Sequence, residues 1–147
     1  MLPRWSNFNQ SDVPALEELR PDEKGYLYGG SGGVYVLRAR DGKRYTVKTS
    51  SSKEALKDEI FSDATYSLLG YKVPLCGLYQ AKYNELPESI QATIPAPIDG
   101  TEEVIFRLAE FIESAKDLLD EDRRQIVKAK LPQGFVVDCF LANTDVV

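Results

Sequence analysis

The residues best suited to chemistry in this sequence are Lys48 and a glycine-rich stretch that precedes it. The stretch consists of Gly29, Gly30, Ser31, Gly32 and Gly33. Glycine lets main-chain N–H groups come close to a phosphate, and a lysine ammonium adds a positive point charge to such a site. A P-loop would need its lysine directly after the last glycine and at the start of a helix. The pattern instead predicts a phosphate-binding loop over the sheet that carries Lys48, and the plain alternative is a hairpin with a solvated lysine.

Three strands are expected around this loop. Residues 26–28 read as the end of the first strand, and residues 34–40 as the second, because β-branched and aromatic residues favour strands. Asp41 and Gly42 are typical of a two-residue hairpin turn, after which residues 43–49 return as the third strand.

Alternation along the third strand places its side chains on two faces. Thr46 and Lys48 share one face, and Tyr45 and Val47 share the other, because successive side chains of a strand point to opposite sides. The face of Lys48 is therefore the one on which the phosphate chemistry is expected.

A helix is expected at about residues 53–69. Its apolar residues recur at helical spacing at Leu56, Ile60, Ala64, Leu68 and Leu69. Ser51 and Glu54 have the spacing of a capping box, and Gly70 is typical of a helix end. Glu59 borders the apolar stripe and could turn inward to pair with Lys48. On local evidence alone, a solvated acid is favoured over this pairing.

The chain before residue 25 reads as a polar arm, with a short helix expected from Asp12 to Leu19. Trp5 and Phe8 are expected to pack this arm onto the body, because buried aromatic side chains mostly serve packing.

Beyond the helix, strands are expected at residues 73–79 and 104–111. Residues 81–100 contain three prolines and read as a loop, with a short strand as an option at residues 93–94. A second helix is expected at residues 117–130, where an acidic half precedes a basic half and so suits the helix dipole.

Composition excludes several kinds of site. The sequence has no histidine, so histidine-dependent catalysis is excluded and acid–base chemistry falls to Asp, Glu, Lys or Tyr. Cys76 and Cys139 lack metal-ligand spacing and predict reduced thiols in a cytoplasmic protein. A net charge of -5 argues against a nucleic-acid partner, and no apolar run reaches the roughly 18 residues of a membrane span.

The sequence LANTD at residues 141–145 resembles the catalytic-loop segment of atypical kinases, the HipA-type and phosphatidylinositol 4-kinase-like group. GGSGGVYVL resembles their glycine-rich loop, YTVK their lysine strand, and EIFSDATYSLLGYKVP their glutamate helix with the turn after it. Residues 107–112 resemble the hinge of these kinases. The resemblance covers about residues 25–147 and implies an α+β fold. That fold would be a kinase-like N-lobe, with an antiparallel sheet of about five strands and one long helix, followed by the first helices of a C-lobe.

The resemblance also implies roles for single residues. Lys48 would bind the α- and β-phosphates of ATP, the glycine stretch would cover the phosphates, and Glu59 would hold Lys48 in place. Asp145 would be the catalytic aspartate beside the acceptor hydroxyl. Adenine would bond to the C=O of Glu110 and the N–H of Ile112.

Two departures from the family pattern stand at the end of the sequence. HipA-type kinases commonly have a histidine two places after the aspartate, where this chain has Val147. The family's metal-binding residues follow the catalytic aspartate, and the sequence ends before their positions. We therefore expect a fragment without metal ligands of its own, inactive alone and able to use Mg²⁺ only when a C-terminal portion is supplied.

The expected division is an arm at residues 1–24, a kinase-like N-lobe at 25–112, and a hinge with a partial C-lobe at 113–147. The expected function is the ATP-binding portion of a phosphotransferase that acts on a protein hydroxyl or a small alcohol. The alternative is a non-catalytic pseudokinase or a split-protein interaction module. The expected partners are a nucleotide and either a protein substrate or a complementing C-terminal chain, in the cytoplasm or, for a secreted effector, in the host cytoplasm.

Overall fold

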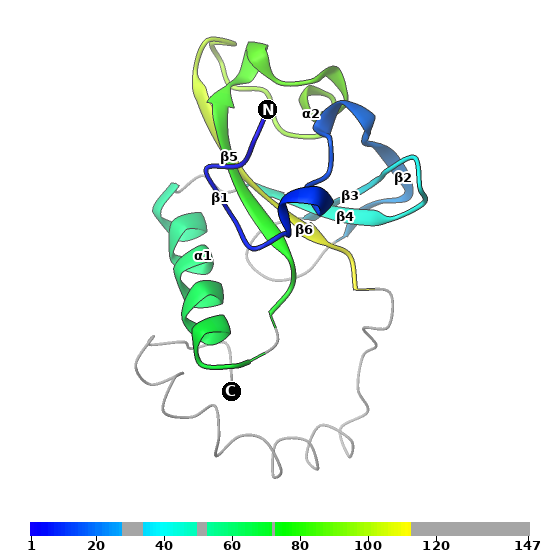
Figure 1. Cartoon of the computed structure of the whole chain (residues 1–147). Helices are drawn as coiled ribbons and strands as arrows, with labels where there is room; N and C mark the ends of the chain where they lie inside the picture. Colours follow the sequence, from blue (N-terminus) through cyan, green and yellow to red (C-terminus); the bar gives the residue numbers. More distant parts are fainter. Residues whose placement is uncertain (28–33, 50–52, 72, 113–147) are drawn as a thin grey trace. The chain divides into compact units, whose positions relative to one another are not determined.

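A computed structural model describes residues 1–27, 34–49, 53–71 and 73–112 of the chain (Figure 1). The glycine stretch, the capping residue Ser51 and the catalytic-loop candidate Asp145 lie outside the described residues, as do the expected helix at 117–130 and the rest of 113–147. Met1–Phe111 forms one structural unit, and the description below concerns that unit.

The described strands form one antiparallel sheet of six, in the order β1-β5-β6-β4-β3-β2. Their bounds are β1 Trp5–Ser6, β2 Arg20–Leu27, β3 Val34–Arg38, β4 Arg44–Thr49, β5 Cys76–Lys82 and β6 Glu103–Glu110. β4 lies inside the sheet between β3 and β6, so the strand that carries Lys48 is paired along both edges. The sheet has one strand more than expected, because the arm contributes β1 by pairing with β5.

The predicted faces of β4 are confirmed. Tyr45 and Val47 are buried in the larger core, whereas Thr46 and Lys48 project to the opposite side. Period-two alternation was sufficient to assign these faces, because β4 is regular throughout its pairing with β3.

The turn between β3 and β4 is longer than the expected two-residue hairpin. The N–H of Ala39 donates to the C=O of Lys43, and residues 40–42 form the loop between them. Gly42 has φ 85°, a left-handed conformation that glycine adopts without strain. Three-residue hairpin loops commonly end on such a residue, which explains why the Asp-Gly signal gave the place of the turn but not its length.

Helix α1 spans Lys53–Leu68 and ends as expected at Gly70. Gly70, with φ 84°, donates to the C=O of Ser67, and Tyr71 donates to the C=O of Tyr66. These two bonds make a Schellman motif, and the rings of Tyr66 and Tyr71 meet edge to face beside it. The motif satisfies carbonyls at the end of α1 and turns the chain back toward β5.

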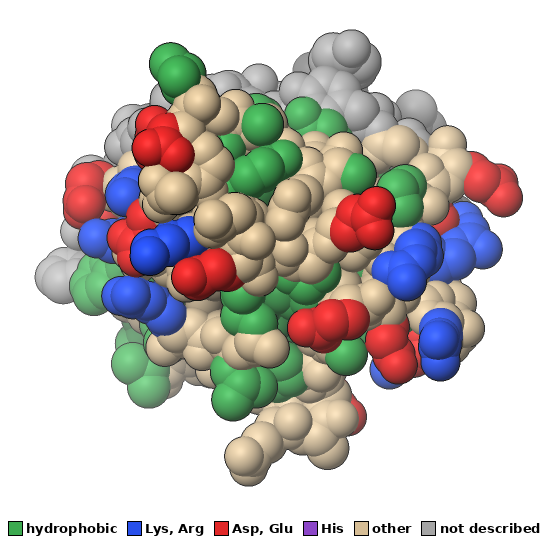
Figure 2. Space-filling view, turned by 90° about the horizontal axis from the view of Figure 1, so that it is seen from above, with side chains coloured by type: hydrophobic (Ala, Val, Ile, Leu, Met, Phe, Trp, Pro, Cys, Tyr) green, Lys and Arg blue, Asp and Glu red, His purple; other side chains and the backbone are tan. Residues whose placement is uncertain are grey.

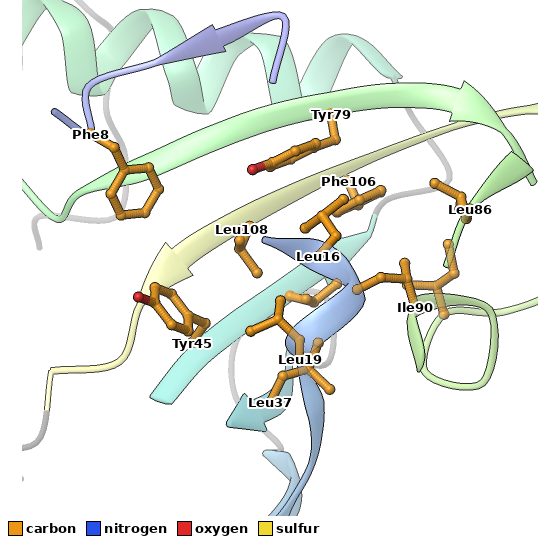
Figure 3. Close-up of a cluster of buried hydrophobic side chains, with 12 residues drawn as sticks. Phe8, Leu16, Leu19, Leu37, Tyr45, Tyr79, Leu86, Ile90, Phe106 and Leu108 are labelled. Atoms are coloured by element: carbon orange, nitrogen blue, oxygen red, sulfur yellow. The ribbon is translucent and has the colours of Figure 1, made fainter. Parts of the chain in front are cut away.

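The two faces of the sheet carry separate cores. On one face, β-strand side chains pack against the arm and the segment around α2, Glu88–Gln91 (Figure 3). Its buried members are Phe8, Leu16, Leu19, Leu37, Tyr45, Val47, Tyr79, Leu86, Ile90, Ile94, Phe106 and Leu108. On the other face lies α1 (Figure 1). It packs through Leu56 and Ile60 onto Cys76, Leu78, Ile105 and Ala109, and Trp5 packs against this cluster.

The arm forms two 3-10 turns, Gln10–Asp12 and Leu16–Glu18, in place of the single helix expected from Asp12 to Leu19. Pro14 explains the difference, because a residue before proline avoids helical angles and Val13 is extended at φ -62° and ψ 117°. Phe8 is buried in the larger core and Trp5 packs on the smaller one, so the expected packing role of both aromatics is confirmed.

The segment after α1 also differs from expectation. β5 begins at Cys76, later than residue 73, because Pro74 has no N–H to donate to a neighbouring strand. The proline-rich segment holds a 3-10 turn at Tyr83–Glu85 and the short helix α2. Thr93 and Ile94 do not form a strand, since both N–H groups donate back to the C=O of Ile90.

The architecture is α+β, with a six-stranded antiparallel sheet and one long helix, and it is consistent with a kinase-like N-lobe. Helix α1 follows β4 in the chain and packs on β5 and β6. Figure 2 shows acidic and basic side chains next to one another on the face seen from above, without a single-sign field. None of the helices in the described ranges is long and apolar enough to cross a membrane.

Candidate functional site

An ion pair joins the centre of the sheet to α1. The ammonium of Lys48, near the end of β4, donates to Oε1 of Glu59, in the middle of α1. The two side chains are 28% and 38% exposed, so the pair lies at the rim of the core and solvent reaches it. The expectation that a carboxylate of this helix meets Lys48 is confirmed.

The strand that follows the glycine stretch in the chain, β3, begins beside Lys48. Val34 directly follows Gly33 in the chain, and in the β3–β4 register Val34 is the partner of Lys48.

A second ion pair, which the sequence reading missed, lies beside the first. Nη2 of Arg107 donates to Oδ2 of Asp63 at 2.7 Å. Arg107 is the register partner of Lys48 across β4 and β6, and Asp63 is one helical turn after Glu59. The i, i+4 spacing of the two acids was visible in the sequence. The cross-strand position of Arg107 was not, because it depends on the register of two strands about 60 residues apart.

The thiol of Cys76 completes this cluster. Cys76 is buried and free, and its Sγ–H donates to Oδ2 of Asp63 at 3.6 Å. Burial is the main reason that the pKa of Cys76 is raised to about 11; the positive charge of Arg107 lowers it and the negative charge of Asp63 raises it. The thiol is therefore protonated at neutral pH and serves as a donor to Asp63.

Arg107 experiences more than one negative charge. Burial by itself would lower the pKa of the guanidinium, but attraction to Cys76 in its deprotonated form at high pH, to Asp63 and to Glu59 outweighs burial and raises the pKa overall. Glu59 is thus within electrostatic reach of Arg107 as well as bonded to Lys48. The cluster consists of two acids on α1 and two cations on the sheet, which balance each other.

Of the remaining predicted site residues, the structure describes only Glu110 and Ile112. Glu110 ends β6, where its N–H donates to the C=O of Leu75, and Ile112 is exposed just beyond it. Gly29 to Gly33 and Asp145 lie outside the described residues. Within the described ranges, no three His, Cys, Asp or Glu side chains gather in a way that could hold a metal ion.

Comparison of the chain with protein-family models, with curated proteins and with solved structures gave no match. The candidate site therefore rests on its own geometry.

Proposed function

We propose that this chain binds ATP as the N-terminal portion of a cytoplasmic phosphotransferase that acts on a protein hydroxyl or a small alcohol. The observation that carries the proposal is the pair between Lys48 and Glu59, which links an internal strand to the helix that follows it.

The pair gives the lysine what phosphate binding requires. A lysine side chain is flexible, and a carboxylate that bonds its ammonium holds the charge in one place. Phosphoryl transfer depends mostly on such positioning and on neutralising charge, since the protein forms few covalent bonds in it. Lys48 keeps access to solvent, so the ammonium can bond a phosphate while Glu59 orients it.

The arrangement of the sheet supports the same face for the nucleotide. The face opposite Lys48 is filled by the arm and the segment around α2, as the larger core shows. The α1 face carries Thr46 and Lys48, with Val34 as the register partner of Lys48. In this proposal adenine bonds to the backbone at Glu110 and Ile112, and Asp145 orients the acceptor hydroxyl.

Titration calorimetry with ATP, with and without Mg²⁺, tests the proposal. Replacing Lys48 with alanine removes a charged hydrogen bond to phosphate and should weaken binding by about 10- to 100-fold. The matched control is Lys57→Ala, since Lys57 is an exposed lysine of α1 that pairs only with Glu54 among the described residues. Equal ATP affinity in the wild type and Lys48→Ala would contradict the proposed site. Phosphate transfer is measured separately, because binding without transfer would support the pseudokinase alternative.

A further inference from the structure

The two ion pairs beneath α1 are arranged so that their partners could be exchanged. Lys48 and Arg107 are cross-strand neighbours on one face, where the Cβ atoms of such residues lie about 5 Å apart. Glu59 and Asp63 lie one turn apart on the facing helix. Glu59 is therefore within electrostatic reach of Arg107 as well as bonded to Lys48.

Arg107 is the stronger competitor for an acid. Its pair with Asp63 is 15% and 19% exposed, less than the pair of Lys48 with Glu59, and charges attract more strongly where less water screens them. In addition, the buried Nε–H of Arg107 has no acceptor among the residues that the structure describes. A guanidinium with a spare buried donor gains by bonding a second carboxylate, and Glu59 is the neighbouring acid on α1.

Asp63 is already bonded to Arg107, and the Cys76 thiol donates to the same Oδ2 atom. As long as Asp63 holds the guanidinium, Glu59 is left to Lys48. A shift of α1 by one turn along its axis would not preserve both ion pairs. The residue one turn before Glu59 is Ala55 and the residue one turn after Asp63 is Ser67, and neither carries a charge.

We propose that Asp63 is a positioning residue, which engages Arg107 and so reserves Glu59 for Lys48. The proposal rests on the proposed function in one respect, that the oriented Lys48 ammonium serves nucleotide binding. Without the Asp63 carboxylate, Arg107 takes Glu59 and Lys48 loses its partner.

The test uses Asp63→Asn, a substitution of nearly equal shape, in the full chain. Two properties are measured: ATP affinity by calorimetry, and the rate at which an amine acylating reagent modifies Lys48, read by mass spectrometry. Asp63→Asn should weaken ATP binding and speed Lys48 acylation, each by roughly three- to tenfold. The acylation measurement needs no nucleotide, so a wild type that fails to bind ATP refutes the proposed function while acylation still decides the positioning role.

Two further backgrounds show through which residue Asp63 acts. In a Glu59→Gln background, Asp63→Asn should have no additional effect on either measurement, because Lys48 has already lost its partner. In Asp63→Asn combined with Arg107→Gln, the competitor is gone and both measurements should return toward the wild type. This double variant loses one negative and one positive charge and so keeps the net charge of the wild type, and both measurements can be made on it if Asp63→Asn alone does not fold.

The matched control is Glu54→Gln, which removes an exposed acid of α1 that pairs with Lys57. It should leave ATP affinity and Lys48 acylation unchanged. The proposal is overturned if Asp63→Asn behaves like Glu54→Gln, if its effect persists undiminished in the Glu59→Gln background, or if Arg107→Gln does not reverse it.

Discussion

The ring of Tyr79 stacks on the ring of Phe106, with the planes 3° apart and the centroids 5.1 Å apart. Both side chains are fully buried in the larger core (Figure 3). The hydroxyl of Tyr79 nevertheless has no hydrogen-bond partner within the described part of the chain. A stacked aromatic pair therefore carries an unsatisfied polar atom into the centre of the fold.

Replacing Tyr79 with phenylalanine should stabilise the protein. The change keeps the stacked ring and removes a buried hydroxyl whose desolvation is uncompensated, so the free energy of unfolding should rise by about 1 kcal/mol. The measurement is urea unfolding followed by circular dichroism. Tyr83→Phe is the matched control, because the Tyr83 hydroxyl donates to the C=O of Gln91 at 2.7 Å and its loss should lower stability by about the same amount. A loss of stability in Tyr79→Phe would contradict the assignment.

Asp22 should be among the acids most important for stability. Its carboxylate is fully buried and bonds Nε of Arg38 at 2.8 Å and Nε of Arg44 at 3.1 Å. The two arginines face each other across β3 and β4, where like charges repel unless an acid lies between them. Asp22→Asn should lower the free energy of unfolding by roughly 2 to 3 kcal/mol, somewhat less than for a fully buried pair because the arginines reach solvent.

The same urea assay measures this change, with Glu18→Gln as its control. Glu18 and Arg40 form an exposed pair at 4.0 Å, and such pairs contribute less than about 1 kcal/mol. Equal effects of the two substitutions would show that the burial of Asp22 does not matter.

Stability should fall at alkaline pH. Burial raises the pKa of Cys76 to about 11 and that of Tyr79 to about 12. In the unfolded chain both groups lose their protons at lower pH, so above about pH 9 the unfolded state binds fewer protons and is favoured as pH rises. Unfolding free energy should drop by on the order of 2 kcal/mol between about pH 9 and 11, measured by urea unfolding under reducing conditions.

Two variants separate the contributions to this alkaline decline. Cys76→Ala should flatten the part of the profile between the ordinary pKa of a thiol and about 11, and Tyr79→Phe the part that ends near 12. A free energy of unfolding that stays level through this pH range in the wild type would show that burial does not raise the pKa of either group.

The features predicted from sequence are those with local periodic signals. Alternation assigned the faces of Lys48 and Val47, and helical spacing with Gly70 gave the extent of α1. The pair of Lys48 with Glu59 followed from combining these two elements, although local evidence had favoured a solvated Glu59. ATP binding and the roles of Asp145 and the glycine stretch stay predictions.

The features that were missed depend on contacts distant in sequence. Strand β1 has two residues and no strand signal of its own; it exists because Trp5 lies opposite Leu78 in β5. The partnership of Arg107 with Asp63 requires the register of β6 against β4 as well as the placement of α1. Neither feature can be predicted from the periodicity of a short segment, because each depends on residues that are far apart in the sequence.

The place of β6 in the sheet has a consequence for the order in which the protein can fold during synthesis. β6 is the last described strand to leave the ribosome, yet it lies between β4 and β5. Until it emerges, the β2-β3-β4 meander and the β1-β5 pair each present an unpaired edge to other chains. The nascent chain is therefore exposed to aggregation until Glu103–Glu110 joins its two halves, and the strand that delivers Arg107 to α1 is also the one that ends this exposure.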